Sequence, residues 1–375
     1  MIKRILEEEI ASNFSRQKVT LLIGARRIGK TLLLQQLYDR FPKNILFLNG
    51  EDEDVHTLLA QRTIANYKRL LQGYTILIID EAQFVPDIGR KAKLMIDEIK
   101  PLHIILTGSS AFHIEQLGEP LTGRTIRYNM YPLAQQELNS TETILETRQL
   151  LEERLVYGCY PEVVSLGTLQ QKQEYLLELV NTYLLKDILV FEDVRSPKKL
   201  KDLLGLLAYQ VGSEVSLEEL GKQLGVSKNT VERYLDLLCK VFVVYRRGGF
   251  SRNLRKEIVK TSRWYFVDNG IRNAIINNFS PLAVRQDVGM LWENYAIGER
   301  QKRNDYGGFS VSPYFWRTYD QQEIDLVEIK DEEINGFELK WKEDKVRTPV
   351  AFAKAYPNAT FNVINQSNYL DWILF

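Results

Sequence analysis

The chain has 375 residues, and its 49 Lys and Arg balance 49 Asp and Glu, so its formal net charge is zero. This balance excludes a protein that binds nucleic acid through overall basic charge, and the length predicts two or three domains with real cores. The two cysteines, Cys159 and Cys239, lack a partner motif, which excludes a zinc cluster and favours a reducing compartment.

A membrane protein is not expected either. No apolar run approaches the ~18 residues that a membrane helix needs. Residues 1–9 become acidic too early for a signal peptide. We therefore expect a cytoplasmic protein with no membrane partner.

A phosphate-binding loop is predicted near the start of the chain. The apolar run 19–23 predicts a strand, and the apolar stripe after residue 31 predicts a helix. Between them lies the spacing G-x-x-x-x-G-K-T, which gathers backbone N–H groups around nucleotide phosphates at a helix N-terminus. In that arrangement Lys30 reaches the β- and γ-phosphates and the Thr31 hydroxyl binds Mg²⁺. The residues expected to bind ATP are Gly24, Ala25, Arg26, Arg27, Ile28, Gly29, Lys30 and Thr31.

The apolar run 75–79 ends in Asp80 and Glu81 and predicts the second half of this site. A continuous apolar run is typical of a parallel strand buried on both faces. In a doubly wound sheet the carboxyl end of such a strand lies beside the phosphate loop. Asp80 is then expected to hold the Mg²⁺ shell, and Glu81 to polarise the attacking water. The alternative is an ordinary strand end followed by a helix-capping Asp.

A single helix is expected from residue 56 to 71. Helices and strands continue to alternate through a strand at 103–106, which predicts an α/β fold with a parallel sheet covered on both faces. The loop, the Asp80-Glu81 pair and the polar cluster after this strand together resemble the AAA+ ATPases and their signal-transducing relatives. The resemblance implies that Ser109 or Ser110 senses the γ-phosphate. It also implies that Arg124, in a Leu-x-Gly-Arg sequence, lies close to the nucleotide. On composition alone, Arg124 is equally an exposed residue paired with a carboxylate.

Beyond this predicted P-loop ATPase core, residues 1–134, the pattern becomes helical. Apolar residues recur at a spacing of three to four up to about residue 191, with a break at 158–162 where Gly and Pro end a helix. We interpret residues 135–195 as a helical lid on the ATPase core.

Residues 196–263 are predicted to form a winged-helix domain. A helix from Ser216 to residue 224, a tight turn at 225–227 and a second helix at 228–238 predict a helix-turn-helix. The following stretch 241–250 resembles a β-wing. From residue 198 to 263 there are 14 Lys and Arg against seven Asp and Glu, so a basic module lies within the neutral chain. The expected DNA contacts are Lys228, Asn229, Thr230, Arg246, Arg247 and Arg252. The alternative is a winged helix that contacts protein.

The last predicted domain, residues 264–375, contains a set of residues that an ATPase does not require. A helix at 292–299, a strand at 322–328 and a turn at 335–336 lead into a strand at 337–341. Glu338 and Lys340 differ by two and share a strand face, and Asp325 pairs with them across the hairpin. Two carboxylates that hold Mg²⁺ and a lysine that orients a water suit phosphodiester hydrolysis. Alternating charges on an exposed strand would give the same pattern.

This set resembles the PD-(D/E)xK, restriction-endonuclease-like fold. The resemblance implies a further glutamate from the first helix, here Glu293, so the expected nuclease residues are Glu293, Asp325, Glu338 and Lys340, with Asp325 and Glu338 as metal ligands.

End to end, the chain resembles prokaryotic AAA+-type ATPases that carry a winged helix and a C-terminal endonuclease-like domain of undefined role. The resemblance predicts a protein that binds ATP or ADP and Mg²⁺, hydrolyses ATP, and couples its nucleotide state to a DNA-binding and Mg²⁺-dependent nuclease half. The alternative is a nucleotide-switched signalling or scaffold protein whose endonuclease-like fold is catalytically silent. Whether the partner is a second copy of the chain or another protein stays open.

Overall fold

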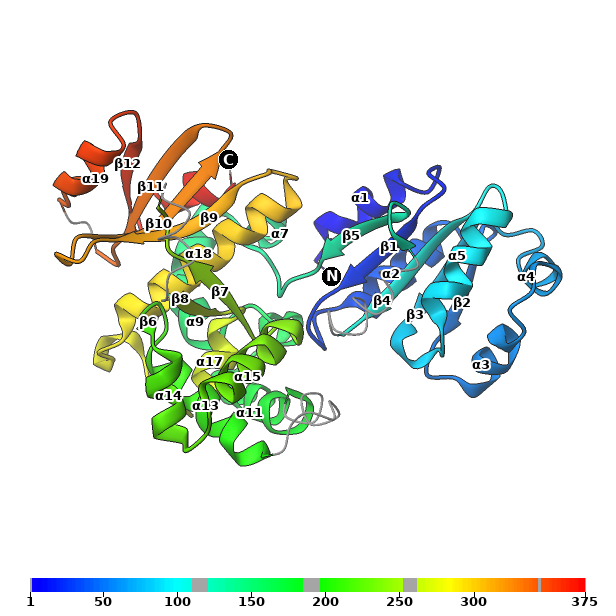
Figure 1. Cartoon of the computed structure of the whole chain (residues 1–375), viewed down its shortest axis with the longest axis horizontal. Coiled ribbons are helices and arrows are strands. Elements are labelled where there is room, and N and C mark those ends of the chain that lie inside the picture. Colours follow the sequence, from blue (N-terminus) through cyan, green and yellow to red (C-terminus); the bar gives the residue numbers. More distant parts are fainter. Residues whose placement is uncertain (1, 110–120, 185–195, 252–261, 343–344, 375) are drawn as a thin grey trace. The chain divides into compact units, whose positions relative to one another are not determined.

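The structure is a computed structural model that describes residues 2–109, 121–184, 196–251, 262–342 and 345–374 (Figure 1). The chain divides into two compact units, Met1–Tyr131 and Pro132–Phe375. Among the described residues, no helix is both long and apolar enough to cross a membrane.

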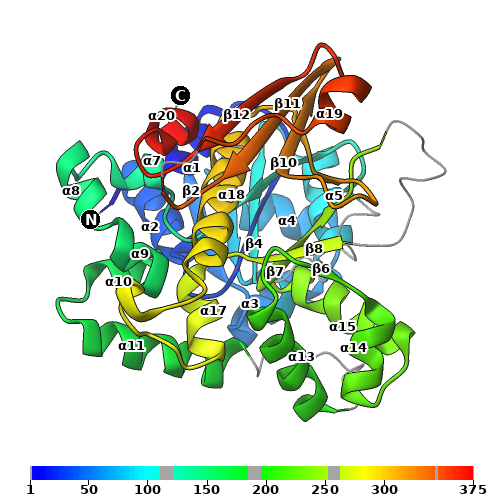
Figure 2. The same ribbon diagram turned by 90° about the vertical axis from the view of Figure 1, so that its left-hand side faces the viewer.

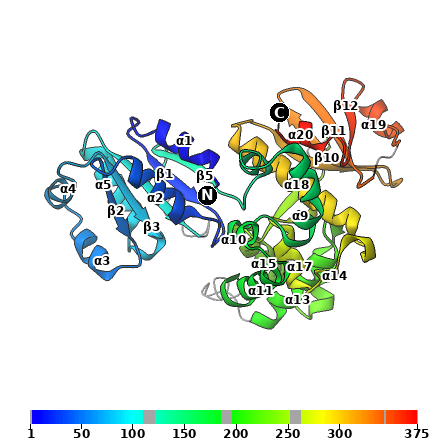
Figure 3. The ribbon, with the colours of Figure 1, turned by 180° about the vertical axis from the view of Figure 1, so that it is seen from behind.

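The first unit is built on a parallel sheet of five strands, seen from behind in Figure 3. Every pair of neighbouring strands runs parallel, and the order is β2-β3-β4-β1-β5. The three central strands are buried along their whole length, as their continuous apolar sequences predict. The predicted parallel sheet is therefore confirmed. The strands are β1 Val19–Ile23, β2 Ile45–Asn49, β3 Ile76–Asp80, β4 His103–Gly108 and β5 Thr125–Asn129.

The helices of this unit differ from prediction at one point. The single helix expected from residue 56 to 71 is two helices, because Thr63 adopts an extended backbone and its side chain accepts a hydrogen bond from the Asn66 N–H, which starts a new helix. The helices are α1 Ile5–Ser12, α2 Lys30–Arg40, α3 Glu53–Ala60, α4 Ile64–Leu70 and α5 Ile88–Glu98, with a 3₁₀ turn at Ala82–Phe84.

The second unit is organised around the long helix α18, Val288–Tyr306, which is yellow in Figure 2. Its side chains bond to segments far away in the sequence. The Asn294 amide bonds both the N–H and the C=O of Phe266. Glu299 accepts a hydrogen bond from the Gln135 N–H at 2.7 Å, and Arg300 pairs with Glu328. One helix thus holds three parts of the unit together.

Two sheets flank this helix. One has the order β6-β8-β7 and the other β12-β11-β10-β9. The strands are β6 Glu214–Val215, β7 Val244–Gly248, β8 Ser262–Phe266, β9 Ser312–Arg317, β10 Glu323–Lys330, β11 Glu333–Leu339 and β12 Thr360–Ile364. The remaining helices are α7 Gln135–Leu138, α8 Ile144–Gln149, α9 Leu151–Tyr157, α10 Pro161–Ser165, α11 Leu169–Glu178, a π-helix Leu179–Leu184, α13 Pro197–Tyr209, α14 Leu217–Leu224, α15 Lys228–Lys240, α17 Asn269–Ile275, a 3₁₀ turn Leu282–Val284, α19 Val350–Ala355 and α20 Tyr369–Leu374.

The hairpin between β10 and β11 corrects a predicted turn. Asn335 and Gly336 lie inside β11, opposite Glu328 and Val327. The chain reverses instead at residues 331–332, where Asp331 adopts φ +54°. Aspartate tolerates this left-handed backbone because its short side chain can hydrogen-bond locally.

The two helices of the predicted helix-turn-helix are both present, as α14 and α15. The Ser216 side chain accepts a hydrogen bond from the Glu219 N–H, and Ser227 does the same for Thr230. Gly225 ends α14 with φ +65°, a backbone that glycine adopts without steric cost. The strands β7 and β8 follow. Arg252 and the other residues up to 261 lie outside the described part of the chain.

Candidate functional site

The loop between β1 and α2 surrounds the Lys30 amine with backbone atoms. The Lys30 Nζ donates to the carbonyl oxygens of Gly24 and Ala25, at 2.9 and 2.8 Å, and Lys30 is only 5% exposed. Gly29 caps α2 with φ +95°. A Cβ atom on Gly24 would lie 2.2 Å from the carbonyl oxygen of Met130, so only glycine fits there. The loop is thus a close-packed turn with a cation at its centre, at the N-terminus of a helix.

Asp80 lies at the carboxyl end of β3 and joins the loop to the sheet. Its Oδ2 accepts a hydrogen bond from the Thr31 hydroxyl at 2.7 Å. Its Oδ1 accepts a short hydrogen bond from the Thr107 hydroxyl of β4. The same Thr107 oxygen accepts the Glu81 N–H at 2.9 Å. The structure therefore brings Thr31, Asp80 and Glu81 together, as the sequence predicted, and adds Thr107 as the residue that links them.

Thr107 was not among the predicted site residues. Its signal in the sequence is a single hydroxyl near the end of a largely apolar strand, and the resemblance placed the sensing residue at Ser109 or Ser110 instead. Ser109 follows β4 at the same edge of the sheet and is buried. Ser110 lies outside the described residues.

The backbone at Glu81 is held in an unusual conformation. Glu81 adopts φ +48°, and its carboxylate accepts a hydrogen bond from the Gln83 side chain. Gly50 packs against the backbone of Asp80 and Glu81. Its N–H donates to the Asp80 carbonyl at 2.7 Å, and a Cβ atom on Gly50 would lie 2.5 Å from the Glu81 carbonyl oxygen. A left-handed glutamate held on two sides is typical of a functional position.

Arg4 is a second residue that the sequence did not reveal. Its guanidinium donates to the Ile28 carbonyl of the loop at 2.8 Å and to the Tyr131 carbonyl at 2.6 Å. Within the loop, Arg27 is exposed with φ +63°, whereas Arg26 is partly buried.

The structure does not bring Arg124 to the loop, which corrects the prediction that it lies close to the nucleotide. Arg124 immediately precedes β5, and its carbonyl accepts the Val19 N–H at the amino end of β1. The loop follows the opposite, carboxyl end of β1. Arg124 pairs instead with Asp97 at 2.7 Å, and both side chains are over one third exposed. The alternative of an exposed ion pair fits this geometry.

A second cluster of charged residues lies in the second unit, where the predicted nuclease residues meet. Asp325 of β10 accepts the Leu339 N–H of β11 at 2.8 Å. Glu338 pairs with Lys340 at 2.7 Å. Burial raises the pKa of Asp325 and of Glu338, and burial together with the nearby Asp325 carboxylate raises the pKa of Glu293 to about 8. The β10–β11 hairpin and helix α18 thus bring Glu293, Asp325, Glu338 and Lys340 into one cluster.

An arginine that the sequence did not place in this cluster lies inside it. Arg263 of β8 is 2.7 Å from Glu323, 3.5 Å from Asp325 and 3.8 Å from Glu293. The Tyr265 hydroxyl donates to the same Glu293 oxygen at 2.7 Å. In the sequence, Arg263 belongs to the basic stretch 198–263, before the predicted C-terminal domain.

The two clusters differ in how well they suit a metal ion. At the loop, the Thr31 hydroxyl and the Asp80 carboxylate are oxygen ligands of the kind that Mg²⁺ prefers, beside the place where phosphates would bind. In the second cluster, both oxygens of Asp325 are engaged, by Leu339 and Arg263. Across the described parts of the chain, no group of three or more His, Cys, Asp and Glu is arranged to hold a metal ion. The donors on Asp325 are an N–H and a guanidinium, which cannot themselves bind a cation, whereas the donors on Asp80 include two hydroxyls, which can. Asp325 therefore does not fit Mg²⁺, while the buried Oε2 of Glu338 has no hydrogen-bond donor among the described residues.

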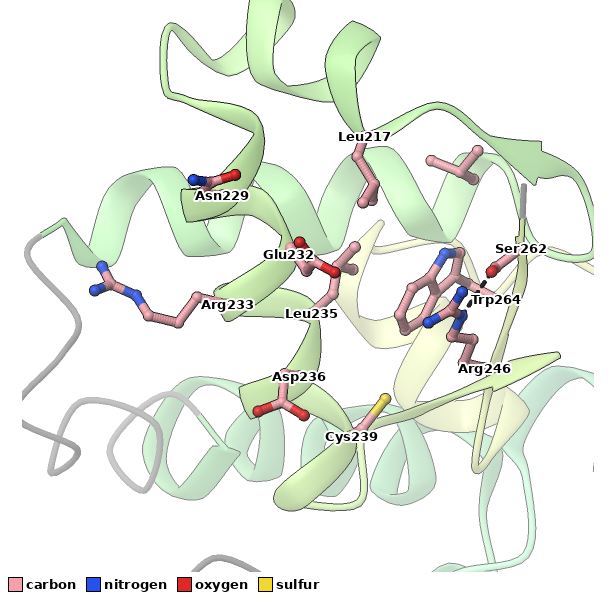
Figure 4. Close-up of a pocket in the computed structure, with 11 residues that line it drawn as sticks. Leu217, Asn229, Glu232, Arg233, Leu235, Asp236, Cys239, Arg246, Ser262 and Trp264 are labelled. Carbon is pink, nitrogen blue, oxygen red and sulfur yellow. Dashed lines mark hydrogen bonds between the residues drawn. The ribbon is translucent and has the colours of Figure 1, made fainter. Parts of the chain in front are cut away.

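The exposed face of α15 adjoins a pocket of about 470 Å³, shown in Figure 4. Apolar side chains, including Leu217, Leu235 and Trp264, line one part of it. The helix contributes Glu232 beside Arg233, and a neighbouring strand contributes Arg246, whose Nε donates to Ser262 at 2.6 Å. The face that would enter a DNA groove therefore carries charges of both signs.

Comparison with protein families divides the chain into three matched segments. Residues 16–139 match a family described as an AAA domain. Residues 148–282 and 288–370 match two domains of unknown function, DUF8612 and DUF4143. The first segment contains the loop and Asp80, and it is similar to the AAA domain family.

Curated relatives extend over most of the chain but carry no assigned function. An uncharacterized protein of Haemophilus influenzae is 24% identical, over 95% of this chain and 94% of its own length. The uncharacterized protein Rv2008c of Mycobacterium tuberculosis is 26% identical, over 87% of this chain and 70% of its own.

Among solved structures, the Walker-type ATPase PABY2304 of Pyrococcus abyssi has a TM-score of 0.51 at 15% identity, covering 74% of this chain and 96% of its own. This likeness shows a shared fold.

Proposed function

We propose that the first unit binds ATP with Mg²⁺ and hydrolyses the bond between its β- and γ-phosphates, releasing ADP and phosphate. The observation that carries the proposal is the hydrogen-bonded set of Thr31, Asp80, Thr107 and Glu81 at the end of the phosphate loop. The match of this segment to the AAA domain supports it.

Each residue of the set has a role that its position supports. Lys30 exchanges its two carbonyl partners for phosphate oxygens, which stabilise its charge more strongly than neutral carbonyls do. Thr31 and Asp80 hold the Mg²⁺, which neutralises phosphate charge when bound. Glu81, fixed through its backbone, orients a water for attack.

Two substitutions separate binding from hydrolysis. Lys30→Ala is expected to weaken ATP binding at least tenfold in calorimetry, because the loop loses its cation. Glu81→Gln keeps the side-chain shape and is expected to bind ATP normally while turnover falls at least a hundredfold. Arg124→Ala is the matched control, because that arginine lies at the amino end of β5, whereas the loop follows the carboxyl end of β1. Equal ATP affinity of wild type and Lys30→Ala would refute the proposal.

A second candidate function is nucleic-acid contact by the segment 196–263, which we propose to be a winged-helix module. The excess of 14 basic over seven acidic residues favours it. The mixed charge on α15, where Glu232 lies next to Arg233, favours a protein surface instead. The domain limits 135–195, 196–263 and 264–375 stay predictions.

A binding measurement with duplex DNA at low salt distinguishes a nucleic-acid partner from a protein partner. If α15 binds phosphates, Lys228→Ala weakens binding and lowers its salt dependence, whereas Glu218→Ala, which removes the carboxylate 3.5 Å from Lys228, does not weaken it. No affinity of the full chain for DNA, with or without ATP, assigns the module to a protein partner or a second copy of the chain.

Nuclease activity is not part of this proposal, because both oxygens of Asp325 are already engaged by protein donors, the Leu339 N–H and the Arg263 guanidinium.

A further inference from the structure

The second charged cluster has a cation of its own. Arg263 is 4% exposed and comes from β8, a strand of the other sheet in the unit. Its guanidinium lies within 4 Å of three carboxylates, those of Glu323, Asp325 and Glu293, which come from β10 and α18. A guanidinium carries five donors and keeps its charge at any pH relevant to proteins. One side chain therefore compensates acids from two separate elements.

The other donors around the cluster also come from the protein. Tyr265 donates to Glu293, the Leu339 N–H donates to Asp325, and Lys340 pairs with Glu338. Three of the four acids are largely buried, whereas the Glu323 side chain is 47% exposed and shares its charge with solvent. The buried acids Glu293, Asp325 and Glu338 thus face two protein cations, Arg263 and Lys340.

The backbone limits the space beside Glu293. Gly212 approaches this carboxylate so closely that a Cβ atom would lie 2.7 Å from its Oε1. The Arg263 guanidinium also packs over the Phe315 ring at 4.7 Å from the ring centre. The Phe315 ring thus packs on the guanidinium, and Gly212 packs on the Glu293 carboxylate beside it, as expected for a structural ion pair.

We propose that Arg263 stands where a divalent cation would bridge Glu293 and Asp325, and that the wild-type chain consequently binds no divalent cation in this cluster. The cluster then acts as a clamp between β8 and the sheet of β10. A backbone hydrogen bond joins the same two sheets, from the Phe250 N–H to the Phe315 carbonyl at 2.7 Å. The proposal is independent of ATP hydrolysis, and it makes the C-terminal fold a binding platform rather than a nuclease.

The test measures Mn²⁺ binding to the full chain without nucleotide, by electron paramagnetic resonance of the free ion. Wild type and Asp325→Asn are expected to bind Mn²⁺ equally, because Asp325 holds no metal in the wild-type chain. Arg263→Gln is expected to gain Mn²⁺ affinity at least tenfold, and Arg263→Gln/Asp325→Asn to lose that gain. Arg263→Lys is the matched control, since it keeps a cation in the cluster and gains nothing.

Two results would overturn the proposal. One is a wild-type Mn²⁺ site that Asp325→Asn weakens tenfold or more, and the other is a folded Arg263→Gln chain without any gain in affinity. Should Arg263→Gln fail to fold, the comparison of wild type with Asp325→Asn decides alone. That comparison needs only variants that keep the arginine in place.

Discussion

Thr107→Val tests whether the hydroxyl between β3 and β4 organises the proposed ATPase site. Valine has nearly the same shape as threonine, so the change removes two hydrogen bonds and leaves no cavity. Thr107 is 1% exposed, and its oxygen donates to the Asp80 carboxylate and accepts the Glu81 N–H. A hydrogen bond to a charged group contributes about 1.5–3 kcal/mol. The Glu81 N–H also donates to the Asp80 carboxylate at 3.2 Å, so the variant removes the shorter of its two hydrogen bonds, which contributes about 0.5–1.5 kcal/mol.

These two terms share one atom and do not add fully, so we expect the first unit to lose about 3 kcal/mol of stability. Because the two units need not unfold together, the loss is best followed by native-state hydrogen exchange at the amides of β3 and β4. Turnover should fall more than tenfold, since Glu81 loses the shorter of the two hydrogen bonds that fix its backbone, and each factor of ten corresponds to about 1.4 kcal/mol of barrier.

Thr107→Ser is the control, because it keeps the hydroxyl and removes only a methyl group. It should retain most of the turnover and of the amide protection. A valine variant with wild-type turnover would show that the Thr107 bridge is incidental to hydrolysis.

Gly24→Ala should weaken ATP binding at least tenfold, because the new Cβ would lie 2.2 Å from the Met130 carbonyl oxygen and the loop must shift. Calorimetry measures the affinity, and an unchanged affinity would contradict the packing argument. Asp287 is partly buried, which opposes its charge, but hydrogen bonds from Arg285 and Arg272 lower its pKa from 3.8 to about 2. Because the folded-state pKa is depressed, this stabilisation is fully present above about pH 4 and is lost as the pH falls toward 2. Asp287→Asn should lower the free energy of unfolding by about 3 kcal/mol at pH 7, because it leaves the buried Arg272 without its carboxylate. It should also remove this pH dependence of unfolding. A variant as stable as wild type at pH 7 would contradict the prediction.

The sequence predicted the first unit well where one physical signal dominates. Buried parallel strands such as β3 are continuous apolar runs, and the polar residues at their ends mark the edge where the site forms. Thr107 was missed because a single hydroxyl inside an apolar strand does not reveal its partners, which come from the neighbouring strand. The Thr63 cap and the Asp331 turn were missed because both depend on the local backbone: the Thr63 side chain starts a new helix through the Asn66 N–H, and Asp331 turns the chain with a left-handed backbone.

The charged cluster of the second unit shows a different limit. Residue spacing along one hairpin correctly placed Asp325 beside Glu338 and Lys340, because alternation along a strand is local geometry. It could not show that Arg263 enters from a strand about sixty residues earlier, since that approach depends on how α18 holds β8 against β10. Converging carboxylates require a compensating charge, yet a metal ion and an arginine satisfy that requirement equally in the sequence. The nuclease interpretation therefore depends on which cation is present, and in this chain a protein side chain already lies within reach of the acids.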